Sequence, residues 1–219
     1  MGQHIQFQSQ AATEQGYLAL PAAGTGPGVL VLHAWWGLTP IFTEICDRLA
    51  NEGFVVFAPD LHSGRVATTI QEAEVLVGDD SPRREAAVFG GLAFLQQHPA
   101  IKGNTQAVIG FSMGAAWALV LSAAIPESIA AVVLFYGAYP VDFSIARAAY
   151  LGHFADQDEW EPLEGVRQME AAMQAAGRDV SINIYPGTQH WFCEPDRPEY
   201  NAAAAQLAWK RTIDFLQHG

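Results

Sequence analysis

Cysteine and positive charge are scarce in this sequence. Its two cysteines, Cys46 and Cys193, are too few for a disulfide framework and lack the spacing of zinc ligands. Eleven Lys and Arg residues are outnumbered by 23 Asp and Glu residues, and the formal net charge is −12. A surface this acidic repels phosphate backbones and anionic lipid. The composition therefore argues against nucleic acid and membrane surfaces as partners.

Long hydrophobic runs and targeting signals are missing as well. There is no stretch of about eighteen consecutive apolar residues, so we expect no membrane-spanning helix. The segment 1–7 contains neither a basic region nor an apolar run, so we expect no secretory signal peptide. Together with the low cysteine content, these absences predict a cytoplasmic protein.

The composition that remains is globular. Hydrophobic residues make up 50 % of the chain and charged residues 16 %, which excludes disorder. A chain of 219 residues has the size of one α/β domain and can bury roughly 70 % of its unfolded surface. We therefore expect a single domain over residues 1–219.

Short apolar runs alternate along the chain with amphipathic stretches. Strands are predicted at residues 16–20, 28–33, 54–58, 107–111, 130–136, 150–155 and 180–185. Helices are predicted at residues 41–51, 82–97, 114–124, 163–176 and 199–217. Several of the strands are apolar throughout, as expected when helices cover both faces of a sheet. The pattern predicts an α/β fold with a doubly wound, mostly parallel sheet flanked by helices.

No cofactor or metal is expected. Gly24, Gly26 and Gly28 precede a predicted strand, whereas the glycines of a dinucleotide-binding fingerprint follow a strand and open a helix. These glycines therefore predict a turn.

Ser112 lies between an apolar strand and a helix-forming run. Gly110 and Gly114 stand two residues before and after it, in the G-x-S-x-G arrangement. A serine exposed at a sheet edge needs a sharp, strained turn, whose flanking positions leave room only for hydrogen. We expect Ser112 to be a nucleophile and the Met113 amide, at the start of the helix, to bind an oxyanion. The alternative is that Ser112 only caps the helix.

A serine nucleophile requires a base and an orienting acid, and on this architecture the order is serine, acid, histidine. His190 follows the last predicted strand, where its imidazole can reach over the sheet edge, and is the expected general base. His153 falls within a strand and is predicted to be a hydrogen-bonded core residue.

The acid is expected in the loop after strand 150–155. Asp158 is favoured, because three loop residues place its carboxylate under the His190 ring, and Asp156 is the alternative. Glu159 is predicted to be an exposed loop charge.

The second oxyanion donor is expected in the loop after strand 28–33. The backbone amide of Trp35 is the predicted donor. His33 comes before the acid and would break the order, so we expect it to hydrogen-bond the backbone of this loop and make it rigid.

These segments together resemble the dienelactone hydrolase family, small cytoplasmic α/β-hydrolases without a lid domain. The resemblance extends from about Gly16 to Leu216. Its motifs are Val29-Leu-Val-Leu-His-Ala-Trp-Trp-Gly-Leu, Phe57-Ala-Pro-Asp-Leu, Gly110-Phe-Ser-Met-Gly-Ala, His153-Phe-Ala-Asp-Gln-Asp-Glu-Trp-Glu-Pro and Tyr185-Pro-Gly-Thr-Gln-His-Trp-Phe. It implies the α/β-hydrolase fold without a lid and strengthens Asp158 as the acid.

The chain departs from that family in two respects. The best-known members have a cysteine nucleophile and a glutamate where this chain has Ser112 and Ala34, which makes it a serine-nucleophile variant. In addition, Cys193 and Glu194 follow His190 where an arginine that holds a lactone carboxylate is expected. The arginines that loops can still bring to the site are Arg65, Arg83, Arg84 and Arg147.

Aromatic residues are concentrated in the loops that are predicted to meet at the carboxyl edge of the sheet, where doubly wound folds bind ligands. The predicted pocket residues are Trp36, Trp160, Trp191 and Phe192. Such walls favour an uncharged ester with an apolar or aryl group. The alternative, strongest for Trp36 and Trp160, is that they only pack the loops. Segment 137–149 is too short for a lid domain, which predicts an open cleft.

The sequence thus predicts a carboxylic-ester hydrolase in which a Ser112–His190–Asp158 triad forms an acyl-enzyme, with neutral small or aryl esters as substrates. A dienelactone-type lactone hydrolase, a thioesterase or an acyltransferase would use the same triad. A non-catalytic binding protein is less consistent with a complete triad. We expect a small-molecule ester or lactone as the partner and a monomer or weak homodimer.

Overall fold

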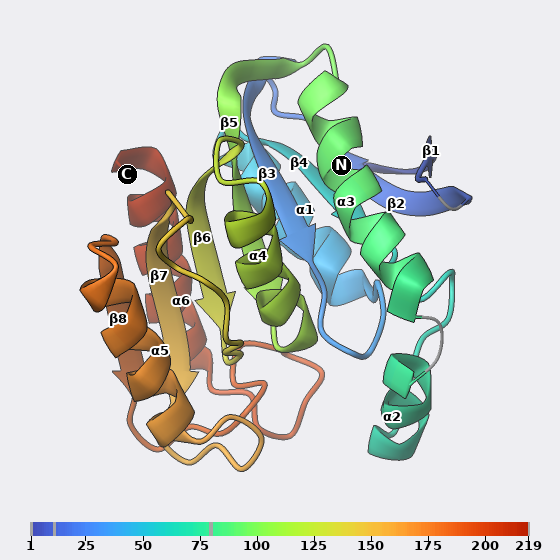
Figure 1. Ribbon diagram of the computed structural model, residues 1–219. Helices are drawn as coiled ribbons and strands as arrows, with labels where there is room; N and C mark the ends of the chain where they lie inside the picture. Colours follow the sequence, from blue (N-terminus) through green and yellow to red (C-terminus); the bar gives the residue numbers. More distant parts are fainter. Residues whose placement is uncertain (1, 11, 79–80, 219) are drawn as a thin grey trace. The chain divides into compact units, whose positions relative to one another are not determined.

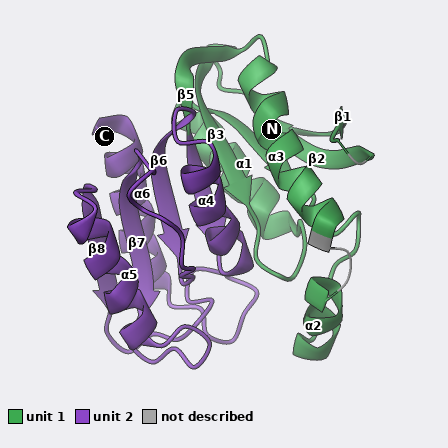
Figure 2. Cartoon of the chain, in the orientation of Figure 1, with its two compact units in different colours: residues 1–106 green, residues 107–219 purple. Residues whose placement is uncertain are grey.

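A computed structural model describes residues 2–10, 12–78 and 81–218. The chain divides into two compact units, Met1–Gln106 and Ala107–Gly219, shown in different colours in Figure 2. Figure 1 labels the helices and strands of both units.

Unit 1 combines parallel and antiparallel strands with three helices. Its strands are β1 (Gln3–Gln8), β2 (Thr13–Ala19), β3 (Gly26–Leu32) and β4 (Val55–Pro59). Its helices are α1 (Pro40–Asn51), α2 (Ile70–Gly78) and α3 (Ser81–Gln97). The strand order is β1-β2-β4-β3, in which β3 and β4 are parallel and the other two pairs antiparallel.

The core of unit 1 forms around β3 and β4. All five residues of β4 are buried, and Val29 to Leu32 of β3 have no exposed surface. The rings of Phe7, Phe57 and Phe94 pack together beside them, with centroids 4.6 to 5.9 Å apart. Continuous apolar runs therefore mark strands covered on both faces, as predicted.

Unit 2 contains the strands that carry the candidate site. Its elements are the end of β5 (Ile101–Phe111), α4 (Met113–Ala124), β6 (Ile129–Phe135), β7 (Ala149–Ala155), α5 (Leu163–Ala175), β8 (Val180–Tyr185) and α6 (Ala202–His218). Strands β6, β7 and β8 are parallel neighbours, with Phe135 opposite His153 and Ala155 opposite Tyr185. Helices α4 and α6 cover opposite faces of these strands (Figure 1).

The fold class predicted from the sequence is confirmed: parallel strands alternate with helices along most of the chain. The connection 136–148 between β6 and β7 contains no helix, so this segment forms no helical lid. No helix in the described part of the chain is long and apolar enough to cross a membrane.

Two elements were not predicted. Strand β1 is mostly polar and lies at the edge of the order, with Phe7 as its buried residue, so it lacks an apolar run. Helix α2 buries Ala73 and Leu76, too few apolar positions for a clear helical pattern. The last helix begins at Ala202 and not at 199, because the Asn201 side chain accepts a hydrogen bond from the Ala204 amide and caps it.

Candidate active site

A strained turn between β5 and α4 presents Ser112. The residue has φ 51° and ψ −113°, in the left-handed region that non-glycine residues rarely adopt. A Cβ on Gly110 would lie 2.3 Å from the Gly114 carbonyl oxygen, so this tight turn requires glycine there. The Ser112 side chain makes no helix-capping hydrogen bond. The alternative that Ser112 only caps the helix is therefore wrong.

Gly137 also shapes the turn and was not among the predicted site residues. A Cβ on Gly137 would lie 2.5 Å from the Ser112 carbonyl oxygen and 2.8 Å from the Ala115 side chain. The next residue, Ala138, donates its amide N–H to Glu161 at 2.7 Å. The one available signal was a glycine placed directly after the end of a predicted strand.

Ser112, His190 and Asp158 are joined by two hydrogen bonds. Ser112 Oγ lies 2.9 Å from His190 Nε2, and His190 Nδ1 lies 2.7 Å from Asp158 Oδ2. The side chains of His190 and Asp158 are 6 % and 1 % exposed. The other carboxylate oxygen of Asp158 accepts the amide N–H groups of Trp160 and Glu161, each at 2.9 Å. Asp158 is thus fixed by its own loop and aims at the imidazole.

The other two acids of this loop have different partners. Asp156 accepts the amide N–H of Thr188 at 3.1 Å and so braces the loop that precedes His190. Glu159 is exposed, as predicted. The acid in contact with the imidazole is therefore Asp158 and not Asp156.

His190 is held at the end of a well-anchored loop after β8. The Thr188 hydroxyl donates to the Tyr185 carbonyl at 2.7 Å, and the Gln157 amide donates to the Thr188 carbonyl at 3.1 Å. Trp191, directly after His190, has φ 64°, which turns the chain sharply. These contacts aim the imidazole back over the strand ends.

The histidines predicted to be structural are structural. His153 is buried between the Tyr185 hydroxyl, at 2.9 Å, and the Thr212 hydroxyl, at 3.0 Å. Burial lowers the pKa of His153 to about 3, so the ring stays neutral. In unit 1, His33 hydrogen-bonds the Ala34 carbonyl and the Leu61 amide, and burial lowers its pKa to about 4.

The two predicted oxyanion donors come from different units. The Met113 amide is the first N–H of α4, where a helix leaves its amides without intrahelical partners. In unit 1 the Trp35 carbonyl is hydrogen-bonded to His62 Nε2 at 3.0 Å, which fixes the following peptide. The role of the Trp35 amide stays a prediction.

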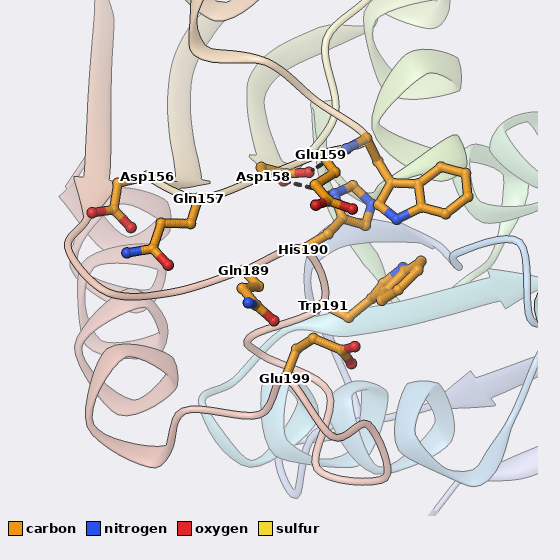
Figure 3. A pocket seen from close by; sticks show the side chains of 9 residues that line it. Asp156, Gln157, Asp158, Glu159, Gln189, His190, Trp191 and Glu199 are labelled. Atoms are coloured by element: carbon orange, nitrogen blue, oxygen red, sulfur yellow. Dashed lines mark hydrogen bonds and ion pairs between the residues drawn. The ribbon is translucent and has the colours of Figure 1, made fainter.

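A pocket of about 500 Å³ lies beside His190 in unit 2 (Figure 3). It is lined by Asp156, Gln157, Asp158, Glu159, Trp160, Gln189, His190, Trp191 and Glu199. The Trp160 and Trp191 rings lie 5.7 Å apart at 46°, so both predicted aromatics line this pocket. None of its lining residues is Lys or Arg.

Two predicted pocket residues are buried in the core instead. Phe192 has no exposed surface and packs against Tyr136 and Tyr185 at 5.6 and 5.0 Å. Trp36 is 2 % exposed and packs edge-on against Trp35 in unit 1. The prediction that these two rings form pocket walls is wrong, because the turn after His190 and the packing of the Trp loop direct them inward.

The four arginines that the sequence left open have structural partners. Arg83 forms a two-bond ion pair with Glu14, and Arg84 donates to the Leu76 and Val77 carbonyls. Arg65 donates to the His62 carbonyl, and Arg147 pairs with Glu127 on the surface of unit 2. Within the described residues, no group of three His, Cys, Asp or Glu side chains is arranged to hold a metal ion.

Comparison with known proteins places the chain in a family. The model of the dienelactone hydrolase family matches residues 15–219. "Protein usf" of Aquifex pyrophilus is 32 % identical over 228 residues, and "Putative carboxymethylenebutenolidase" of Aquifex aeolicus (strain VF5) is 30 % identical over 228 residues. Both alignments cover 99 % of this chain and 98 % of the relative.

The fold is shared with a solved structure as well. The crystal structure of "Putative Dienelactone Hydrolase" from Klebsiella pneumoniae subsp. pneumoniae MGH 78578 has a TM-score of 0.89 and 23 % identity. The match covers 100 % of this chain and 99 % of that one, and it shows the α/β-hydrolase fold. On these grounds the chain belongs to the dienelactone hydrolase family, a family of hydrolases.

Proposed function

We propose that the protein hydrolyses carboxylic esters through a covalent acyl-enzyme on Ser112. The observation that carries the proposal is the continuous hydrogen-bonded chain from Ser112 Oγ through His190 to Asp158. A serine hydroxyl is a weak nucleophile unless a base takes its proton, and a base works best when a third group fixes its orientation. This arrangement has both parts, at 2.9 and 2.7 Å.

In the first half of the reaction, His190 Nε2 takes the hydroxyl proton as Ser112 Oγ bonds to the acyl carbon. Asp158 accepts a hydrogen bond from the Nδ1–H of the imidazole and stabilises its positive charge. The Met113 amide, together with the predicted Trp35 amide, binds the oxyanion of the tetrahedral intermediate. His190 then gives the proton to the leaving alcohol, and the acyl group stays on Ser112.

In the second half, His190 deprotonates water, the hydroxide attacks the acyl carbon, and the acid leaves as the proton returns to Ser112. A lactone is an intramolecular ester and follows the same steps. A thiol leaving group or an alcohol acceptor would give a thioesterase or an acyltransferase. We propose water as the acceptor, since seven of the nine residues that line the pocket beside His190 are polar or charged.

A fluorophosphonate probe tests the nucleophile directly. We expect it to label Ser112 alone, because only a hydroxyl paired with a base attacks such a phosphorus centre at a useful rate. Peptide mass spectrometry locates the label, and heat-unfolded protein serves as the control that should not react. Labelling on a different serine, or none on the folded protein, would refute the proposal.

The charge of the substrate is a second test. Four of the nine pocket residues are Asp or Glu and none is Lys or Arg. A like charge in a partly desolvated pocket costs on the order of 1 kcal/mol or more, and each 1.4 kcal/mol is about tenfold in rate. We therefore expect a neutral p-nitrophenyl ester to exceed its carboxylate-bearing analogue by at least roughly tenfold in kcat/KM.

The salt dependence separates two origins of this preference. If the net charge of −12 causes it, raising the ionic strength shrinks it. If the pocket carboxylates cause the preference, Glu199→Gln should reduce it, while salt should have little effect. Equal turnover of both esters at low salt would contradict the expected preference for the neutral ester. An anionic lactone would then be the favoured substrate.

A further inference from the structure

Glu194 is a buried carboxyl group four residues after His190, and the proposed steps do not use it. The residue is 1 % exposed, and Glu194 Oε1 accepts a hydrogen bond from the Tyr136 hydroxyl at 2.8 Å. Burial, with smaller contributions from Asp196 and Glu199, raises the pKa of Glu194 to about 8, against the opposing effects of the Tyr136 hydrogen bond and Arg197. At neutral pH the carboxyl group is therefore mostly protonated and uncharged.

Tyr136 connects this carboxyl group to the imidazole. Its ring lies 5.0 Å from the His190 ring, at an interplanar angle of 59°. Its backbone is anchored at the end of β6, where the amide donates to the His153 carbonyl at 2.8 Å and φ is 40°. The strand end thus holds one end of the Tyr136 side chain, and Glu194 holds the other.

The two hydrogen bonds of His190 leave one motion open. They are made by Nδ1 and Nε2, at roughly opposite edges of the ring, so the imidazole can still tilt about the line through these two atoms. The Tyr136 ring, at 5.0 Å, and the edge-on Trp191 ring, at 4.9 Å, both pack against the imidazole and oppose this tilt. Tilt matters, because Nε2 must reach first Ser112 and then the leaving group, and a displacement of about 1 Å can cost about 100-fold in rate.

We propose that Glu194 and Tyr136 are positioning residues that hold the His190 imidazole in line between Ser112 and Asp158, an inference that rests on the proposed function. Apolar side chains of the same size would fill this space with less desolvation. A hydrogen bond is directional, whereas apolar packing is not, so the bond from the hydroxyl to Glu194 fixes the position of the tyrosine along its long axis.

The pair is expected to work only in its uncharged form. Ionisation of Glu194 would place a charge in the core beside Tyr136, Cys193 and the acidic groups of Asp196 and Glu199, with Arg197 as the opposing cation. The Tyr136 hydroxyl can still donate to the ionised carboxylate, so the loss of the ring's position is expected to come from the repacking that an uncompensated buried charge forces, and not from loss of the hydrogen bond. We therefore expect Glu194 and Tyr136 to hold the His190 imidazole in place below about pH 8 and to lose this effect as the pH rises through that value.

The experiment measures kcat, KM and the rate of fluorophosphonate labelling of Ser112 from about pH 6 to pH 10. Tyr136→Phe and Glu194→Leu should each lower kcat and the labelling rate by about tenfold or more, with KM within about twofold. Glu194→Gln, whose amide oxygen still accepts the Tyr136 bond, should keep the native rate at neutral pH. It should also lack the decline of the native enzyme above about pH 8.

Tyr150→Phe is the matched control. Tyr150 is also a buried tyrosine of unit 2, and its hydroxyl donates to Ser122 at 2.9 Å. This variant should lose thermal stability and keep the native pH profile. If Glu194→Leu fails to fold, Tyr136→Phe still tests the proposal, because it keeps the aromatic ring and removes only the hydroxyl.

Three outcomes overturn the inference. Native kcat and an unchanged pH profile in Tyr136→Phe would show that the hydroxyl positions nothing. A Glu194→Gln variant as slow as Glu194→Leu would show that the hydrogen bond is not what matters. A native protein that neither turns over esters nor is labelled at Ser112 would overturn the proposed function and this inference with it.

Discussion

Replacing Ser112 with alanine is expected to lower kcat for carboxylic esters by roughly four to six orders of magnitude. The variant has no oxygen to form the acyl-enzyme, so His190 can only activate water directly. The residual rate would come from substrate binding and from the oxyanion donors, which the substitution leaves in place. Steady-state turnover of a p-nitrophenyl ester measures the loss.

The fold should survive this change. Alanine at 112 gives up one hydrogen bond, worth about 1 kcal/mol, and keeps the backbone strain of the turn. Ser122→Ala on α4 is the matched control, since Ser122 is buried and hydrogen-bonded to Leu119 and Tyr150. The control should lose at least as much thermal stability and keep its turnover. Full activity in Ser112→Ala would end the proposed mechanism.

Replacing Asp158 with asparagine is expected to cost about four orders of magnitude in kcat. The Asn amide can donate toward His190 Nδ1, which favours the tautomer with its proton on Nε2, and that nitrogen then cannot take the proton of Ser112. Fluorophosphonate labelling of Ser112 should slow in parallel, because both reactions need the same base. The variant keeps the size and shape of the side chain, so loss of folding is not expected to explain the effect.

Asp156→Asn is the control for that result. Asp156 accepts the Thr188 amide N–H at 3.1 Å, and an asparagine oxygen can accept the same bond. We expect a change in kcat of less than about tenfold, against about 10⁴-fold for Asp158→Asn. If Asp156→Asn is the more damaging of the two, the acid has been misassigned by two residues.

Strands β3 and β4 of the core were predictable because each is a largely continuous apolar run. Residues 28–33 and 54–58 correspond to β3 and β4 within two residues at each end. Strand β1 escaped prediction for the opposite reason, since an edge strand is held by backbone pairing with β2 and needs few apolar side chains. The pattern of apolar residues in a sequence indicates which segments are buried. Strands and helices that bury few side chains are therefore hard to predict from it.

The sequence by itself determined the family, the fold class and the turn that presents Ser112, because strand, glycines and helix start are all local features. Three features were decided only by the tertiary structure. Asp158 and not Asp156 contacts the imidazole, the Phe192 ring is buried in the core, and Glu194 is hydrogen-bonded to Tyr136. The choice of acid and the pairing of Glu194 with Tyr136 depend on hydrogen bonds between residues 32 and 58 positions apart. Such contacts depend on the direction in which each loop directs its side chains. That direction is fixed by tertiary packing and cannot be predicted from the local sequence pattern.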